Sequence, residues 1–142
     1  AQRLNDQDRS FLQDIVRTAV VEMNLGHIAL EHARKEDTKK VARESVRRYS
    51  EINSAARRML LKFGQTLPSN LNPIHSAELF EKLGAQPDRE YARLSAESQG
   101  KLTEALEREV ASGADPVIKT WAKRLLPDIR ASFERVQEMA QP

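Results

Sequence analysis

The sequence predicts an all-α protein built as a bundle of four long helices. Alanine, leucine, glutamate, arginine and lysine dominate the 142 residues, whereas there are five glycines and 5% aromatic residues, a balance that favours helices over sheets. Apolar residues also recur at alternating steps of three and four, as they do on the buried face of a bundle helix. Residues 1–142 are therefore expected to form one helical domain.

Two long helices are expected in the first half of the chain. Asp6 and Asp8 can cap a first helix over about 9–34. A second helix is predicted over about 38–63, where Gly64 suits the left-handed conformation that closes many helices.

Three further helices are expected in the second half. The pair Asn72–Pro73 can cap and begin a short helix over about 73–83, which Gly84 ends. Two long helices follow over about 88–111 and 116–139, separated by a short segment that contains a glycine and a proline.

The lengths of the connections predict how these helices are arranged. The first two long helices are joined tightly, as are the last two, so each pair is expected to form an antiparallel hairpin. The connection over 64–87 can traverse the second helix, which is about 39 Å long at 1.5 Å per residue. The predicted fold is therefore a ferritin-like four-helix bundle of two hairpins, joined by a long crossover that contains a short helix.

Each long helix carries a polar residue near the middle of its predicted buried stripe. A glutamate on the buried side of a four-helix protein can be the first ligand of a metal site, or a polar contact without chemistry. Helical spacing therefore predicts a buried polar cluster made of Glu22, Tyr49, Gln99 and Ser132.

The sequence offers little of the chemistry that an enzyme would need. A di-metal site in such a bundle requires about four carboxylates and two histidines, and the diagnostic Glu-x-x-His pairs do not occur in the sequence. The absence of cysteine excludes thiolate sites and cysteine nucleophiles. No glycine-rich elbow surrounds a serine, and no phosphate-binding loop is present. We therefore predict no catalytic residue, no metal ligand set and no cofactor.

The second helix is strongly basic. Between residues 38 and 63 there are eight basic residues against two acids. This face can meet anionic lipid headgroups, lipopolysaccharide or an acidic protein, although a solvated charged face explains it too. The small net charge of +2 and the lack of interleaved aromatic residues argue against nucleic acid. The residues expected to contact an anionic partner are Lys39, Lys40, Arg43, Arg47 and Arg48.

Several stretches resemble a known bacterial family. They are "VEMNLGHIA" at 21–29, "VARESV" at 41–46 and "SGADPVIKTWAKRLLP" at 112–127, and they are similar to the exported helical domain of unknown function labelled DUF4142, whose members often carry an outer-membrane-protein label. The resemblance implies a ferritin-like bundle, a signal peptide upstream of the chain and a periplasmic or envelope location.

The same resemblance bears on the four polar positions. Family members commonly show a glutamate on the first helix, which Glu22 matches, and histidines at the inward positions of the other three. Here those positions hold Tyr49, Gln99 and Ser132, so the resemblance implies a hydrogen-bonding cluster with one carboxylate.

Two functions are compatible with these observations. The first is a non-enzymatic periplasmic or envelope protein that acts as an interaction or stress-related module on an anionic envelope component or an acidic protein. The alternative is a ferritin-like metal-binding protein or oxidase with a site around Glu22. No transmembrane segment is expected, because charged residues interrupt every apolar run well before the roughly 20 residues that a bilayer requires.

Overall fold

The computed structural model describes residues 4–68 and 76–142, which form five helices and no strand. The all-α prediction is confirmed, and the predicted start of the short helix at Asn72–Pro73 lies outside the described residues. Each observed helix begins and ends within about three residues of its predicted range where it can be compared. The helices are α1 (Asp6–His32), α2 (Glu36–Lys62), α3 (Ser76–Leu83), α4 (Pro87–Ser112) and α5 (Pro116–Ala140).

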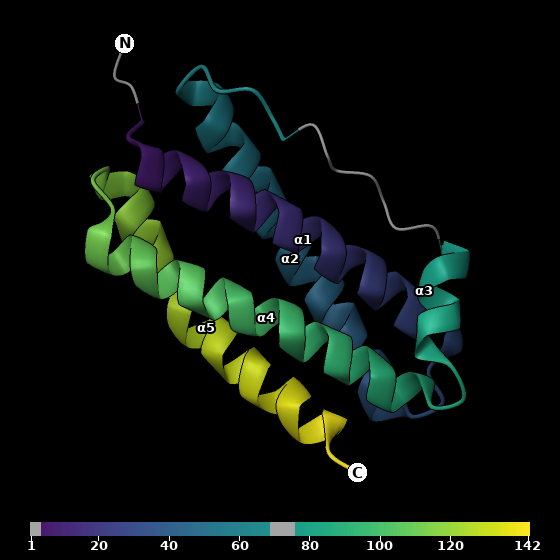
Figure 1. Cartoon of the computed structure of the whole chain (residues 1–142). Coiled ribbons are helices and arrows are strands. Elements are labelled where there is room, and N and C mark those ends of the chain that lie inside the picture. The colour runs from purple at the N-terminus through teal and green to yellow at the C-terminus, as the bar shows by residue number, and fades with distance from the viewer. Residues whose placement is uncertain (1–3, 69–75) are drawn as a thin grey trace.

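The helices are arranged as two hairpins. Figure 1 shows α1 paired with α2 and α4 paired with α5, and the two hairpins pack together through α1 and α4. The short α3 contacts α1 and α4. Helices α2 and α4 run in the same direction, which the long connection between them makes possible (Figure 1). The predicted bundle of two hairpins with a long crossover is therefore confirmed.

The helix ends use partly different residues from those expected. The side chain of Asn5, rather than Asp6 or Asp8, caps α1 by accepting a hydrogen bond from the backbone N–H of Asp8 at 2.8 Å. Asp6 and Asp8 lie inside the first turn, where a negative charge still stabilises the helix dipole. Gly64 and Gly84 have φ values of 70° and 60°, the left-handed conformation that was predicted for Gly64.

An aspartate near the start of each hairpin holds the turn of the other hairpin. Asp88, in the first turn of α4, accepts hydrogen bonds from the backbone N–H groups of Arg34 and Lys35 at 2.9 and 3.0 Å. Asp8, in the first turn of α1, accepts one from the backbone N–H of Asp115 at 2.9 Å. The two contacts lie at opposite ends of the antiparallel α1–α4 pair, so they fix its alignment at both ends.

These hydrogen bonds act on Asp88 itself. Partial burial alone would raise the pKa of this carboxyl, but the backbone N–H donors of Arg34 and Lys35 outweigh burial and lower it. Asp88 therefore remains ionised while it holds the α1–α2 turn.

The core consists of two apolar clusters. The first cluster occupies the end of the bundle where α1 begins and includes Phe11, whose ring meets that of Trp121 edge to face at 6.2 Å. The second occupies the other end and includes Leu25 and Val136. Along α1 the first cluster ends at Ala19 and the second begins at Leu25, which leaves a polar layer in between. Within residues 4–68 and 76–142, no helix combines the length and the apolar character needed to cross a bilayer.

Helices α1 and α2 approach closely at Gly26. A Cβ atom built on Gly26 would lie 2.5 Å from Cγ2 of Val46 and 3.2 Å from the carbonyl oxygen of Ala42. Because Val46 is branched at Cβ and has few rotamers, it cannot move aside easily. The glycine therefore permits the close contact within the first hairpin.

This contact makes Gly26→Ala a destabilising substitution. Replacing a helical glycine by alanine ordinarily stabilises the folded state by about 0.5–1 kcal/mol, but overpacking destabilises it by about 1–3 kcal/mol. We therefore expect urea unfolding to show a net loss of stability of about 1 kcal/mol. In a Val46→Ala background the same change should be neutral or stabilising. An equal loss in both backgrounds would contradict the close approach of the two helices.

Candidate functional site

The polar layer between the two apolar clusters is centred on Glu22. This side chain is 0% exposed. The hydroxyl of Ser95 on α4 donates to both carboxyl oxygens of Glu22, at 3.1 and 2.9 Å. Nε2 of Gln99, one turn further along α4, donates to Oγ of Ser95 at 2.9 Å. We call the buried set at this level the Glu22 cluster: Glu22, Ser45, Tyr49, Tyr91, Ser95 and Gln99.

Burial determines the charge of Glu22. Desolvation raises the pKa of Glu22 to about 8, although the nearby hydroxyls of Ser95, Ser98 and Ser45 oppose the rise. The carboxyl is therefore mostly neutral at pH 7. A neutral carboxyl carries its own O–H donor, which can serve the acceptors around it.

Some of those acceptors need such a donor. Within the described residues, the hydroxyl of Tyr49 and Oε1 of Gln99 have no hydrogen-bond partner, whereas Ser45 lies near enough to Glu22 and Tyr91 to act on the pKa of both. A buried polar atom without a partner costs about 1–3 kcal/mol. The unpartnered atoms of the cluster therefore lower the free energy of unfolding, and each hydrogen-bond donor that reaches one of them offsets part of this loss.

The two tyrosines are also held in their neutral form. Burial raises the pKa of Tyr49 and of Tyr91, and the proximity of Glu22 raises both further. The cluster thus consists of hydroxyls, an amide and a carboxyl that resist ionisation near neutral pH.

Three of the four predicted cluster residues are in place, and one is not. Glu22, Tyr49 and Gln99 are buried together, but Ser132 is only half-buried and lines a surface depression between α2 and α5. Phe133 explains the difference, because its ring packs against α4 over Gly100, where an added Cβ would meet it at 3.2 Å. Ser132 is thereby turned to the edge of the helix.

The structure adds three residues to the predicted cluster. Ser45 and Ser95 each lie one helical turn before a predicted cluster residue, Tyr49 and Gln99 respectively, but small hydroxyl side chains gave no reason to single them out. Tyr91 lies one turn before Ser95 on α4, so helical spacing alone could have placed it beside Ser95.

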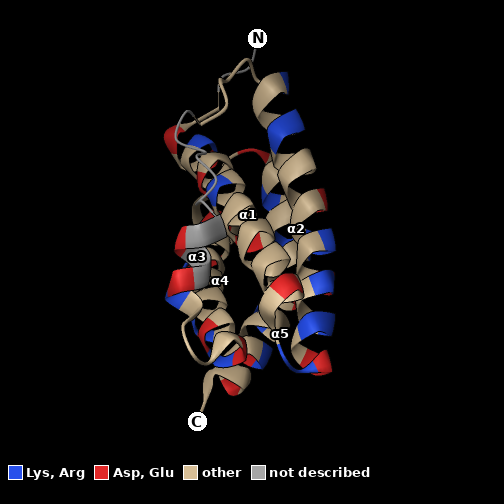
Figure 2. Ribbon diagram, turned by 90° about the vertical axis from the view of Figure 1, so that its right-hand side faces the viewer, with Lys and Arg blue, Asp and Glu red and all other residues tan. Residues whose placement is uncertain are grey.

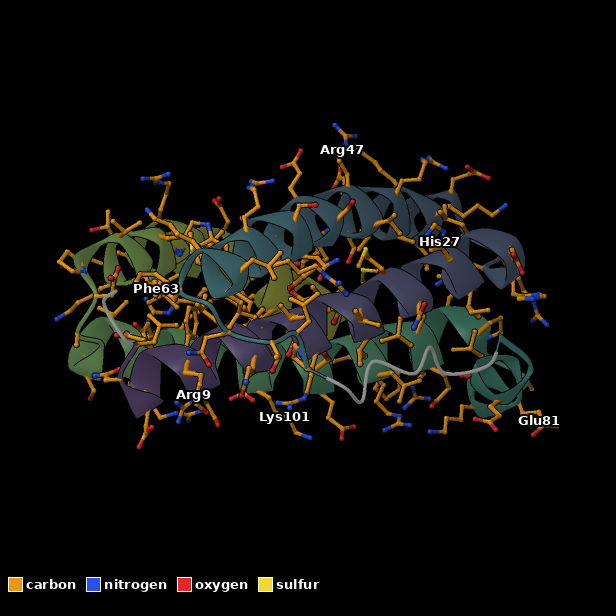
Figure 3. The ribbon with its side chains drawn as sticks, turned by 90° about the horizontal axis from the view of Figure 1, so that it is seen from above. Arg9, His27, Arg47, Phe63, Glu81 and Lys101 are labelled. Atoms are coloured by element: carbon orange, nitrogen blue, oxygen red, sulfur yellow. The ribbon has the colours of Figure 1, made fainter. Side chains whose placement is uncertain are left out.

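The donor set around Glu22 does not fit a di-metal centre of the ferritin type. Such a centre needs several carboxylates and histidines, whereas the neighbours of Glu22 are hydroxyls and one amide. No group of three or more histidine, aspartate or glutamate side chains with metal-binding geometry occurs in the described parts of the chain. Neither histidine within residues 4–68 and 76–142 belongs to the cluster: His27 is exposed (Figure 3), and His32 lies beside Glu31 at 3.6 Å.

A second buried carboxyl was not foreseen. Glu109 is 0% exposed and accepts a hydrogen bond from Nε2 of Gln7 at 3.2 Å. Burial raises its pKa, and the adjacent Asp8 adds to the rise through a hydrogen bond and through its charge. Asp8 in turn accepts hydrogen bonds from the backbone N–H groups of Ala114 and Asp115.

The predicted basic face lies on the outer side of α2. Figure 2 shows its basic residues along the side of α2 that faces away from the bundle, and Figure 3 shows Arg47 pointing outward. Lys40, Arg43 and Arg47 are exposed, whereas Lys39 and Arg48 are half-buried. Lys39 lies 3.7 Å from Glu36, but the other four make no ion pair within the described residues. We call Lys39, Lys40, Arg43, Arg47 and Arg48 the α2 basic face.

The state of Glu22 makes stability depend on pH. In the unfolded chain the carboxyl loses its proton near pH 4.5, and in the folded chain near pH 8. Between these values the unfolded state alone is ionised, so stability falls as pH rises, by at most about 1.4 kcal/mol per pH unit. Glu22→Gln removes the part of this decline that Glu22 contributes, so the variant should be about as stable as the wild type at pH 5 and more stable than the wild type at pH 8.

Urea unfolding between pH 5 and pH 8 measures this difference. The matched control is Glu104→Gln, the same change at an exposed position of α4, which should follow the wild-type profile. If Glu22→Gln instead lowered the free energy of unfolding by more than about 3 kcal/mol at every pH, Glu22 would have an ionic partner, because this is the scale of a broken buried charge pair.

Comparisons with known proteins agree with the architecture. A crystal structure of a DUF305 fragment from Deinococcus radiodurans has a TM-score of 0.83 to this chain at 16% sequence identity and covers 98% of both chains, which shows a shared fold. No curated protein matches the sequence. The family described as Domain of unknown function (DUF4142) matches residues 1–139. The chain therefore belongs to the DUF4142 family, a family of helical domains of unknown function.

Proposed function

We propose that this protein is a non-enzymatic binding module of the cell envelope that attaches to anionic lipid headgroups through the α2 basic face. The observation that carries this proposal is the row of exposed cations on α2 without ion-pair partners. Arg43 and Arg47 are one helical turn apart and both exposed, so they project from the same side of α2.

The shape and composition of the face favour a lipid surface over a protein partner. It is the outer side of a single helix about 40 Å long at 1.5 Å per residue. The depression beside it, between α2 and α5, is lined by charged side chains such as Arg47 and Glu51 as well as by apolar ones such as Trp121. The exposed positions that follow Arg47 include Ser50 and Ser54, which are polar. A membrane surface with many phosphate groups can pair with each cation in such a row, whereas an interface with a protein partner ordinarily also has an apolar centre.

The buried cluster supports a binding role over catalysis. Glu22 is 0% exposed, and so are the two tyrosines beside it. A substrate could not reach these groups unless the bundle opened. The exposed cations of α2, in contrast, can meet a partner without any opening of the bundle.

Binding to lipid vesicles tests the proposal. The chain should bind vesicles that contain an anionic phospholipid, should bind zwitterionic vesicles poorly, and should be released as salt screens the charges. Since each cation near such a surface contributes about 1 kcal/mol, Arg43→Glu with Arg47→Glu should weaken binding more than about tenfold.

The matched control is Arg108→Glu with Lys123→Glu. This pair gives the same change in net charge at exposed residues of α4 and α5 and should bind nearly as well as the wild type. Equal losses of affinity for anionic vesicles in the two double variants would show that binding depends on overall charge and not on the α2 basic face. Binding to zwitterionic vesicles as strong as to anionic ones would overturn the proposal.

A further inference from the structure

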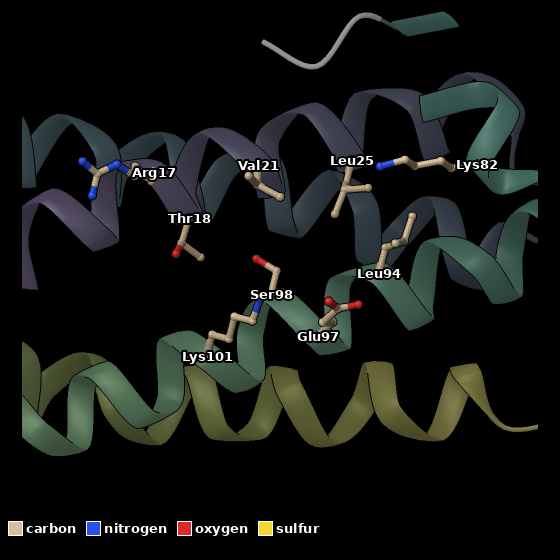
Figure 4. A pocket seen from close by; sticks show the side chains of 9 residues that line it. All are labelled: Arg17, Thr18, Val21, Leu25, Lys82, Leu94, Glu97, Ser98 and Lys101. Carbon is tan, nitrogen blue, oxygen red and sulfur yellow. The ribbon is translucent and has the colours of Figure 1, made fainter. Parts of the chain in front are cut away.

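A groove between α1 and α4 lies on another side of the molecule from the α2 basic face. Figure 3 shows Lys101, at this groove, and Arg47 pointing in opposite directions. The groove has a volume of about 280 Å³, close to the lower end of the range of about 300–1,000 Å³ for small-molecule sites. Figure 4 shows the side chains that line it from α1, α3 and α4.

The middle of the groove is apolar. Val21 and Leu25 come from α1, and Leu94 faces them from α4 (Figure 4). The stretch of α1 from Thr18 to Leu25 is about 10 Å long at 1.5 Å per residue. This length suits an alkyl chain of medium length and is too short for a whole phospholipid.

The margin of the groove is positively charged. Three cations and one acid are among its lining residues. The acid, Glu97, lies 3.9 Å from Arg93, which is outside the lining. Lys82 and Lys101 make no ion pair in the described parts of the chain, so both ammonium groups are available to an anion.

Hydroxyl groups accompany the cations at one end. Figure 4 shows Thr18 and Ser98 on opposite walls near Arg17. Arg17 lies 3.3 Å from Asp14, but both side chains are about half exposed, so this ion pair is weak. Behind Ser98 lies Glu22, whose neutral form presents no negative charge to the groove.

We propose that this groove binds a small amphiphilic carboxylate. The alkyl chain lies over Val21, Leu25 and Leu94, where it removes apolar surface from water. The carboxylate lies at the end of Thr18 and Ser98, where hydroxyl donors and the nearby cations satisfy it. The aliphatic stem of Lys82 covers the other end of the chain.

Sodium decanoate, used below its micelle concentration, is the probe. In an NMR titration of the ¹⁵N-labelled chain, saturable shifts are expected at the amides of residues 17–25 and 94–101. Decanol, which has the same chain length without the charge, should bind at least about tenfold more weakly, equivalent to about 1.4 kcal/mol.

Two variants separate the charge from the apolar contact. Arg17→Glu with Lys101→Glu, which reverses the two lining cations nearest Thr18 and Ser98 (Figure 4), should weaken decanoate binding about tenfold or more, whereas Arg108→Glu with Lys123→Glu has the same change in net charge and should have little effect. Leu94→Gln should weaken decanoate and decanol alike. The amide spectrum of each variant verifies that it is folded.

Three results would overturn the proposal. One is equal affinity for decanoate and decanol. Another is an equal loss of affinity in both charge-reversed variants. The third is a set of shifts located elsewhere, for example around the exposed Leu61 and Val117, with none in the groove.

Discussion

The desolvation of Glu22 governs the middle of this bundle. A carboxylate cannot be buried without a counter-charge except at high cost, and the neighbours of Glu22 are hydroxyls and an amide. The carboxyl therefore takes its neutral form, and its hydrogen bonds to Ser95 fix α1 against α4 at this level. The polar layer also separates the two apolar clusters. A shift of α1 along α4 by one turn would leave these polar groups among apolar side chains, so the cluster favours one alignment of the two hairpins.

The ends of the bundle are aligned by a repeated device. Asp8 and Asp88 occupy corresponding places in the two hairpins, each in the first turn of its hairpin's first helix, and each accepts hydrogen bonds from the other hairpin's turn. The α1–α4 pair is thus held at both ends by aspartates and in the middle by Glu22. Glu109 lies buried beside Asp8, and its pKa is raised chiefly by burial and further by the adjacent Asp8.

Much of the fold could be predicted from the sequence, since apolar spacing, caps and glycines act locally. The spacing also placed Glu22, Tyr49 and Gln99 inside. It failed at Ser132, because a stripe defined by steps of three and four does not say which of two adjacent residues faces the core, and the bulk of Phe133 decides that question. The Asp8 contact was missed for a different reason: an aspartate at a helix start is ordinarily a cap, and its partners are about a hundred residues away in the sequence.

The structure separates a closed polar core from two exposed surfaces that we propose as binding sites, the α2 basic face and the α1–α4 groove. This account depends on Glu22 being a neutral structural carboxyl rather than an ion-paired or metal-bound one. The most direct measurement is a titration of the Glu22 side-chain carboxyl by ¹³C NMR in the folded protein, assigned by comparison with Glu22→Gln. The account predicts a midpoint near pH 8. A midpoint at or below the ordinary value of 4.5 would contradict it, because it would show that Glu22 is ionised and stabilised by a positive partner.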